Sequence, residues 1–334
     1  MRNRCKARDV TDVLNRTNAS MAATPSPTAA LSKPSITAII LAGNEEIHIA
    51  RCLSRIMPLV ERVVVIDSFS SDRTVEIARS MGAEVLQHAW KNYSDQFQWG
   101  LDNAKPTTAW VLRLDSDEYL EPGAQAALRQ GLATMPDDVT GLTFQLKVIF
   151  QERWIRHGRY YSTVLLRMWR TGVGQIEQRW MDEHIVLSRG ITQQIAGGDL
   201  VDHNLNDIGW WTDKHNRYAT RHMVDYINRE YGLYAEDDRI QSTAAAARSK
   251  RFMKNSVYGR APIYLRAVLF YLYRYVIRLG FLDGKQGFVF HFLHGCWMMM
   301  LIDAKIDEAR TYIAAHGIEA FKQHLKSHHK IDVT

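Results

Sequence analysis

The chain has 334 residues, of which 46% are hydrophobic and 23% are charged, and this is the ordinary composition of a globular protein with a sizeable core. Its three cysteines, Cys5, Cys52 and Cys296, are far apart and odd in number, which argues against a disulfide framework or a zinc motif. The net charge is only +6, yet residues 239–282 hold nine basic residues and no acidic one. We expect this segment to face something anionic, such as phosphates or acidic lipid headgroups.

The first 34 residues lack the apolar core of a secretory signal, and they become rich in Ala, Ser, Thr and Pro toward residue 34. Such a composition cannot bury enough apolar surface to order the chain. We therefore predict a disordered leader over residues 1–34.

Short apolar runs alternate with helical patterns from residue 36 to about residue 133. This alternation predicts an α/β fold with a parallel sheet and right-handed crossovers. The expected strands cover residues 36–42, 61–67, 83–88 and 108–115, and the expected helices cover residues 43–56, 71–82 and 94–104.

After residue 140 the pattern changes to longer apolar segments. Strands are expected over residues 141–150 and 160–170, followed by a glycine-containing turn and the segment 175–187. A long helix is predicted over residues 208–232, beginning at Asp207.

Three of the expected strands end in polar or acidic residues. In open α/β sheets, ligands bind outside the carboxyl ends of the strands. We therefore expect one crevice to be lined by Asn44 and Glu45, by Asp67 and Ser68, and by Asp115 and Asp117.

The stretch VLRLDSDEYL, residues 111–120, places three carboxylates directly behind an apolar strand. Their mutual repulsion is unfavourable unless something positive lies nearby. One interpretation is an acidic turn that faces water. The other is that Asp115 and Asp117 supply hard oxygen ligands to Mg²⁺ or Mn²⁺, which would turn a diphosphate into a leaving group.

Three motifs, in this order and spacing, resemble the nucleotide-sugar-binding half of glycosyltransferase family 2. They are IILAGNEE at residues 39–46, VVVIDSFSSDRT at residues 63–74 and DSDE at residues 115–118. The resemblance implies a GT-A fold, which is a Rossmann-like, mostly parallel sheet flanked by helices. It also implies sugar transfer with inversion from a nucleotide-sugar, with a UDP-sugar as the expected donor.

The resemblance also implies roles for single residues. Asp67 would contact the base, Asp115 would face the nucleotide ribose or phosphate, and Asp117 would hold the metal, with Asp115 as a second metal candidate. Gly43 departs from the family, in which a larger residue often precedes Asn44. The other expected contacts to the donor are Ala42, Asn44, Glu45, Ser68, Lys91, Gln96 and Ser116.

The stretch RWMDEHIVL, residues 179–187, is the candidate for the catalytic base. Inverting transfer needs a base that removes the proton of the acceptor hydroxyl. Related lipopolysaccharide-core glucosyltransferases have a His–Glu pair in a similar place, so Glu183 is favoured, with Asp182 as its competitor and His184 as an orienting partner. The alternative is a solvated acidic turn paired with Arg179.

A basic row lies on the helix predicted over residues 208–232. Lys214, Arg217 and Arg221 have the spacing of one helix face. The segment resembles one found in family members that build surface polysaccharides, which implies work near the acceptor phosphates or the donor diphosphate. Ordinary helix packing is the alternative.

Two apolar runs near the C-terminus raise the question of a membrane. Residues 263–282 are interrupted by Arg266, Arg274 and Arg278, and residues 287–302 carry no Asp, Glu, Lys or Arg. Neither run comfortably reaches the roughly 20 apolar residues that span a bilayer. We predict a hairpin at about residues 260–303 that lies in the inner leaflet, against the alternative of a buried helical hairpin.

The resulting hypothesis has three regions. The leader precedes a GT-A catalytic domain at residues 35–205, with a nucleotide-sugar half at 35–135 and an acceptor half at 136–205. A helical, membrane-associated region follows at residues 206–334.

In function, we expect an inverting, metal-dependent glycosyltransferase acting on a lipid-linked glycan or lipopolysaccharide-core acceptor. It would be attached, as a peripheral or monotopic protein, to the cytoplasmic side of the inner membrane. No nucleic-acid partner is expected. The alternatives are a sugar nucleotidyltransferase, whose usual Gly-rich loop after the first strand is missing here, and a non-catalytic membrane-bound scaffold.

Overall fold

The computed structural model describes residues 33–178, 180–181, 183–234 and 262–333. The chain divides into two units, residues 1–32 and residues 33–334, and every described helix and strand belongs to the second unit. All but the last two residues of the predicted leader lie outside the described residues.

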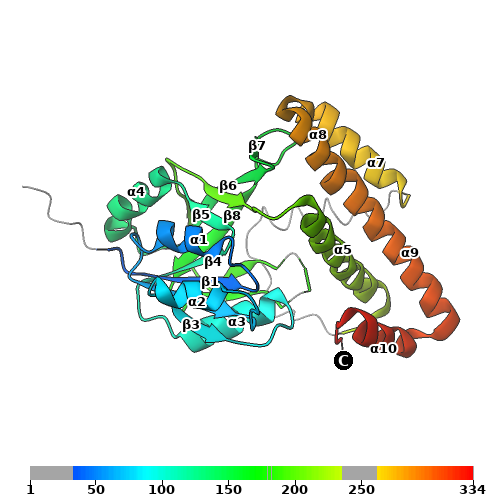
Figure 1. Cartoon of the computed structure of the whole chain (residues 1–334), viewed down its shortest axis with the longest axis horizontal. Coiled ribbons are helices and arrows are strands. Elements are labelled where there is room, and N and C mark those ends of the chain that lie inside the picture. The colour runs from blue at the N-terminus through cyan, green and yellow to red at the C-terminus, as the bar shows by residue number, and fades with distance from the viewer. Residues whose placement is uncertain (1–32, 179, 182, 235–261, 334) are drawn as a thin grey trace, which may run out of the picture. The chain divides into compact units, whose positions relative to one another are not determined.

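A parallel half-sheet with connecting helices forms the first part of this unit (Figure 1). Strands β1, β2, β3 and β4 pair in the order β3-β2-β1-β4, all of them parallel. All seven positions of β1 are buried, as expected for a central strand covered on both faces. The strands are Ile36–Ala42, Arg62–Asp67, Glu84–Gln87 and Trp110–Asp115, and the helices between them are α1 (Ile49–Ile56), α2 (Thr74–Ser80) and α3 (Tyr93–Ala104).

The second part adds both parallel and antiparallel pairings to this sheet. Beyond β4 the order continues β8-β6-β12-β5, with β7 and β11 also pairing with β6, and β9 and β10 form a separate two-stranded sheet. The sheet is therefore mixed, because β8 runs antiparallel to both β4 and β6. The elements are β5 (Glu118–Leu120), α4 (Pro122–Gly131), η1 (Leu132–Thr134), β6 (Val139–Phe150), β7 (Arg153–Ile155), β8 (Val164–Arg170), β9 (Gly174–Ile176), β10 (Ile185–Leu187), β11 (Ile191–Gln194) and β12 (Leu200–His203).

The first helix is shorter than the one predicted over residues 43–56. Asn44 has a left-handed backbone, with a φ of 57°, and this conformation cannot continue into a right-handed helix. The chain therefore makes a turn before α1, and His48 rather than Asn44 is its N-cap residue.

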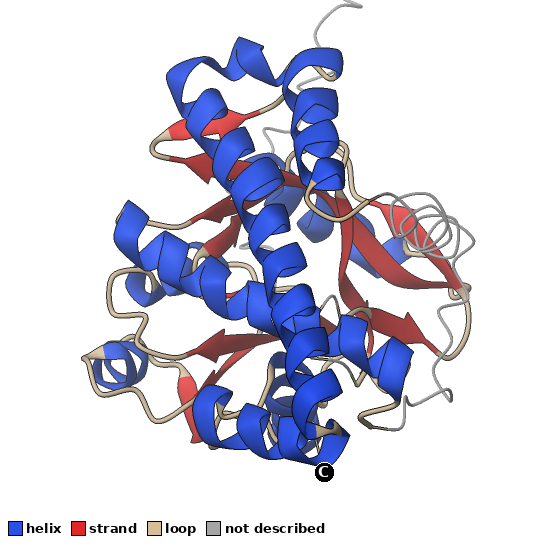
Figure 2. Ribbon diagram, turned by 90° about the vertical axis from the view of Figure 1, so that its right-hand side faces the viewer, coloured by secondary structure: helices blue, strands red, loops and turns tan. Residues whose placement is uncertain are grey.

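The long helix α5 (Ile208–Tyr231) confirms the prediction over residues 208–232. Its N-cap residue Asp207 accepts a hydrogen bond from the backbone N–H of Trp210 at 2.8 Å, and it ends at Gly232, which has a φ of 66°. It packs along α9 (Met298–His316), and α10 (Ile318–His329) completes this second core (Figures 1 and 2).

The hairpin predicted at about residues 260–303 is helical. It consists of α7 (Leu265–Leu272), η3 (Tyr273–Ile277), η4 (Gly280–Asp283), α8 (Gly284–Phe292) and η5 (Leu293–Trp297), which continues into α9. Among the described residues, one helical stretch, Gly280–His316, is long and apolar enough to cross a membrane, and 44% of its apolar window is buried inside the protein. Length and composition alone are weak evidence for a span.

The expectation that residues 239–282 turn their positive charge toward an external anion is wrong for two arginines. Arg266 is only 4% exposed and its Nε donates to Asp303 at 2.9 and 3.0 Å. Arg274 is also buried, donates from Nε to the Gly158 carbonyl at 3.0 Å and lies 4.0 Å from the centre of the Tyr160 ring. Both cations are satisfied by partners inside the fold. Residues 239–261 lie outside the described part of the chain.

Replacing Asp303 with Ala is expected to lower the free energy of unfolding by about 3–5 kcal/mol, because it leaves Arg266 buried without its counter-charge. Asp307→Ala, one turn further along α9 at an exposed position, is the matched control and should cost less than about 1 kcal/mol. Urea unfolding followed by circular dichroism measures both, and equal stabilities of the two variants would contradict the assignment.

Candidate active site

The loops that follow β1 and β2 are fastened to each other. The backbone N–H of Asn44 donates to the Ser70 hydroxyl at 2.8 Å, and the Asn44 side-chain oxygen accepts from the N–H of Ser71 at 2.8 Å. In addition, the N–H of Glu45 donates to the Thr74 hydroxyl at 2.7 Å. The two loops therefore form one rigid rim at the carboxyl ends of their strands.

Gly43 lies against Ser68 in this rim. The N–H of Ser68 donates to the Ala42 carbonyl at 2.9 Å, and a Cβ at position 43 would lie 2.5 Å from the Ser68 hydroxyl oxygen. A side chain at position 43 would therefore require the Ser68 hydroxyl to shift.

Asp67 is fully buried at the end of β2. One carboxylate oxygen accepts from the N–H of Ser70 at 3.0 Å and from the Gln87 amide at 2.9 Å, and the other accepts from the Ser70 hydroxyl. In this structure the carboxylate holds the turn together, and its contact with a nucleobase stays a prediction.

Lys91, in the β3–α3 loop, and Gln96, in the first turn of α3, have different surroundings. Gln96 is buried and contacts His88 through both polar atoms of its side-chain amide. The Gln96 amide oxygen lies 3.0 Å from a ring nitrogen of His88, and the Gln96 amide nitrogen donates to the backbone carbonyl of His88 at 3.2 Å. Lys91 is exposed. Trp99 stacks on the His88 ring at 4.4 Å between ring centres, so it packs within the fold as expected.

The positive group required by the acidic stretch is Arg167, on β8. Its guanidinium donates to the buried carboxylate of Glu118 and lies 3.5 Å from a carboxylate oxygen of Asp115. The second oxygen of Asp115 accepts from the Tyr93 hydroxyl. Ser116 is buried, and its hydroxyl donates to the Leu41 carbonyl at 2.6 Å, which fixes the end of β4 against β1.

Asp117 has a different set of partners. Its carboxylate accepts from the Asn204 amide at 2.9 Å and lies 3.9 Å from the ammonium of Lys214, on α5. Burial by itself would raise the pKa of Asp117, but Lys214 and Asn204 outweigh it and the pKa is lowered. This side chain is therefore an anion that can serve as a ligand.

Asp202 is a fourth acidic residue, which the sequence analysis missed. The antiparallel pairing of β12 with β5 places it opposite Glu118. Burial, together with the charge of Asp117, raises the pKa of Asp202 to about 7. Burial also raises the pKa of Glu118 to about 8, despite Arg167. The segment around Asp202, LVDH, offers no motif that could have identified it.

The acid cluster, defined as Asp115, Asp117, Glu118 and Asp202, thus outnumbers its two basic partners, Arg167 and Lys214. In the described part of the chain, no three His, Cys, Asp or Glu side chains are arranged to hold a metal ion by themselves. Magnesium at phosphate-transfer sites usually needs only one or two carboxylates, because waters and substrate phosphates complete its shell. Asp117, whose pKa is lowered and which is therefore ionised, fits that mode of binding.

The loop between β9 and β10 carries the candidate base. It is closed by Glu177, whose N–H donates to the His184 carbonyl at 2.9 Å and whose carboxylate accepts from the His184 N–H at 3.3 Å. Glu183 is partly buried, and its charge acts on Arg221, from α5. Asp182 and Arg179 lie outside the described residues.

His184 has a partner other than the one expected. Its ring nitrogen lies 3.4 Å from a carboxylate oxygen of Glu177, a buried residue that the sequence analysis did not single out. This pair links the two ends of the loop. An orienting action of His184 on Glu183 stays a prediction.

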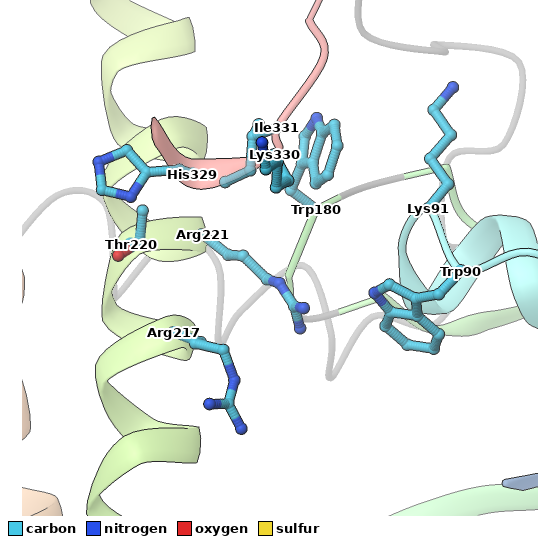
Figure 3. Close-up of a pocket in the computed structure, with 9 residues that line it drawn as sticks. All are labelled: Trp90, Lys91, Trp180, Arg217, Thr220, Arg221, His329, Lys330 and Ile331. Carbon is cyan, nitrogen blue, oxygen red and sulfur yellow. The ribbon is translucent and has the colours of Figure 1, made fainter. Parts of the chain in front are cut away.

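A pocket of about 400 Å³ lies beside this loop (Figure 3). Residues from the β3–α3 loop, from the β9–β10 loop, from α5 and from the C-terminal end contribute to it. The lining residues are Trp90, Lys91, Trp180, Arg217, Thr220, Arg221, His329, Lys330 and Ile331.

Comparisons with known proteins now bear on this geometry. Residues 37–187 match the sequence model of glycosyl transferase family 2. An uncharacterized glycosyltransferase of Rickettsia felis is 32% identical over 118 residues, which cover 35% of this chain and 41% of that protein. The matched part thus spans about two fifths of the length of these curated relatives.

A lipopolysaccharide core biosynthesis glycosyltransferase of Rhizobium meliloti, LpsC, matches over a longer stretch. It is 23% identical over 274 residues, which cover 79% of this chain and 91% of that protein. Among solved structures, a glucosyl-3-phosphoglycerate synthase from Mycobacterium tuberculosis, in complex with Mn²⁺, UDP and glucosyl-3-phosphoglycerate, matches at 22% identity. It covers 34% of this chain and 44% of that chain, with a TM-score of 0.28, which is too low to support any conclusion about mechanism.

The matched residues include Asp115, Asp117 and Glu118, which are three of the four members of the acid cluster. The match therefore indicates that the chain contains a glycosyltransferase domain. Residues 37–187, a little under half of the chain, match glycosyltransferase family 2. The predicted family and its α/β, GT-A fold are confirmed.

Proposed function

We propose that this protein is an inverting, metal-dependent glycosyltransferase. It would transfer a sugar from a nucleotide-sugar, with a UDP-sugar as the expected donor, to a lipid-linked glycan or lipopolysaccharide-core acceptor. The observation that carries the proposal is the acid cluster, in which Asp115 ends β4 and Asp117 follows it, so that both lie where open α/β sheets bind ligands. The likeness to LpsC over most of both chains supports the acceptor class.

Asp117 and Asp115 would hold the divalent ion. When bound, the ion would neutralise the diphosphate and make it a better leaving group. Lys214 keeps the Asp117 carboxylate ionised. Arg167 contacts both Glu118 and Asp115 and so restrains these two carboxylates.

Glu183 would act as the base. The acceptor oxygen forms a bond to the anomeric carbon while the bond from that carbon to the diphosphate oxygen breaks, and the acceptor proton passes to Glu183. Arg221, from α5, lies close enough to Glu183 for their charges to interact. Asp182 stays the competing candidate.

The family match argues against a sugar nucleotidyltransferase. A non-catalytic scaffold would bind donor without turning it over, so assays of donor turnover also distinguish that alternative.

Membrane attachment is the second part of the proposal. The hairpin buries one side, including Arg274 and Phe290, and exposes large apolar side chains on another. Twelve large apolar side chains of residues 265–292 are exposed, whereas soluble proteins rarely expose large apolar patches. The exposed Arg278 among them suits anionic headgroups. We propose peripheral or monotopic attachment to the cytoplasmic face of the inner membrane through this apolar surface, which consists of Leu265, Val268, Leu269, Leu272, Tyr273, Val276, Ile277, Leu279, Phe281, Leu282, Phe288 and Phe292.

Asp117→Asn is expected to reduce metal-dependent turnover by about a hundredfold or more, because it removes an ionic ligand of the donor's metal. A panel of UDP-sugars is assayed for donor hydrolysis with Mn²⁺ and with EDTA. Asp213→Asn, at an exposed position next to Lys214 on α5, is the control and should retain activity. Wild-type turnover in the Asp117 variant would remove the metal assignment.

Glu183→Gln is expected to lower transfer by about 10²–10⁴-fold while donor affinity persists, because only proton removal is lost. Turnover and UDP binding with Mn²⁺ are measured on the same preparation, with Asp182→Asn in parallel. Normal turnover in the Glu183 variant, together with a loss in the Asp182 variant, would move the base to Asp182.

Leu269→Glu combined with Ile277→Glu should weaken vesicle binding by about tenfold or more, because both side chains would enter the acyl region. Flotation with phosphatidylcholine–phosphatidylglycerol vesicles measures it. Ile191→Glu, which replaces a side chain that is 55% exposed on β11, is the control. If the wild-type protein stays in the soluble fraction at low salt, the hairpin is not a membrane anchor.

A further inference from the structure

The pocket of Figure 3 has an unbalanced charge. Four of its nine lining residues carry a positive charge, and none is acidic. Its volume of about 400 Å³ is within the usual range for small-molecule sites. These positive side chains repel each other, and an anion bound between them would offset that repulsion. The four cationic residues are Lys91, Arg217, Arg221 and Lys330.

The position of the pocket along α5 separates it from the acid cluster. Lys214 contacts Asp117, whereas Arg217 and Arg221 follow three and seven residues later. At a rise of about 1.5 Å per residue, they lie roughly 4.5 and 10 Å further along the helix axis. Arg221 thus leaves the helix about two turns beyond Lys214, the residue that faces Asp117.

The pocket instead adjoins the loop of the candidate base. Trp180, three residues before Glu183, is one of its walls, and Glu183 and Arg221 interact electrostatically. Because the acceptor hydroxyl must reach the base, groups near this loop are placed to meet the acceptor.

The walls also suit a sugar. Trp90 and Trp180 contribute aromatic surfaces (Figure 3), and the Arg221 guanidinium lies 5.7 Å from the centre of the Trp90 ring, which is a cation–π distance. The planar guanidinium can donate two parallel hydrogen bonds to a phosphate or carboxylate.

We infer that this pocket binds an anionic substituent, phosphoryl or carboxylate, carried by the acceptor glycan. Arg217 and Arg221 hold the anion from α5, Lys330 approaches it from the C-terminal end, and the two tryptophans contact the adjoining sugar ring. The inference rests on the proposed glycosyltransferase function and adds to it the chemistry of the acceptor.

Isothermal titration of the full chain with three hexoses tests this assignment. Glucose 6-phosphate and glucuronate represent the two anions, glucose is the neutral reference, and UDP with Mn²⁺ is titrated separately. We expect at least one anionic sugar to bind about tenfold or more tighter than glucose, and the better of the two identifies the substituent. The double variant Arg217→Gln/Arg221→Gln should lose that preference and keep its affinity for UDP with Mn²⁺ within about twofold.

Two further variants make the outcome decisive. Arg229→Gln, exposed on the same helix outside the pocket, should behave as wild type. Lys330→Gln changes an exposed side chain outside α5. It should weaken binding of the anionic sugar severalfold, and this result does not depend on whether the double variant folds well.

Equal binding of all three hexoses to the wild type would overturn the inference. The inference would also be overturned if the double variant lost affinity for UDP with Mn²⁺ together with its affinity for the anionic sugar. That result would assign the pocket to the donor diphosphate. Failure of the wild type to bind UDP with Mn²⁺ would count against the proposed function instead.

Discussion

The acid cluster can exist only because two basic side chains reach it from elsewhere in the chain. A buried charge without a partner costs several kcal/mol, and here the four carboxylates of the cluster share one edge of the sheet. Arg167 pairs with Glu118 and Asp115, and Lys214 faces Asp117. The raised pKa values of Glu118 and Asp202 show that their ionised forms stay unfavourable at this site, and a bound divalent ion would favour those forms. The electrostatics of the site therefore tie the sheet, α5 and the proposed chemistry to each other.

The topology of the sheet provides these partners. The parallel strands β1 to β4 bring the acidic residues to one edge, and β8 then runs antiparallel beside β4 and delivers Arg167. Strand β12 lies between β6 and β5 and adds Asp202. Residues 35–135 alone would hold three of the four carboxylates, without Asp202, Arg167 or Lys214. For this reason, the terms nucleotide half and acceptor half describe only which ligand each part is expected to bind. We expect the two halves to fold together.

Features with a local cause could be predicted from the sequence, whereas those that depend on distant partners could not. The strand at residues 36–42 follows from an apolar run, and the bounds of α5 follow from the cap at Asp207 and from Gly232. Arg167 and Asp202 carry no local signal, because their roles arise only when β8 and β12 are placed in the sheet. Arg266 was misinterpreted for the same reason, since its partner, Asp303, comes 37 residues later.

Helix α5 connects the two proposed sites mechanically. One face of it packs against α9 through residues such as Ala219 and Met223, and this packing fixes its rotation. Lys214, Arg217 and Arg221 therefore point where the helical spacing dictates, toward Asp117 at one end and toward the pocket at the other. Groups on a packed helix are held more precisely than groups on a loop. A transfer reaction needs this precision, because the acceptor oxygen must meet the anomeric carbon at a set distance from the departing diphosphate.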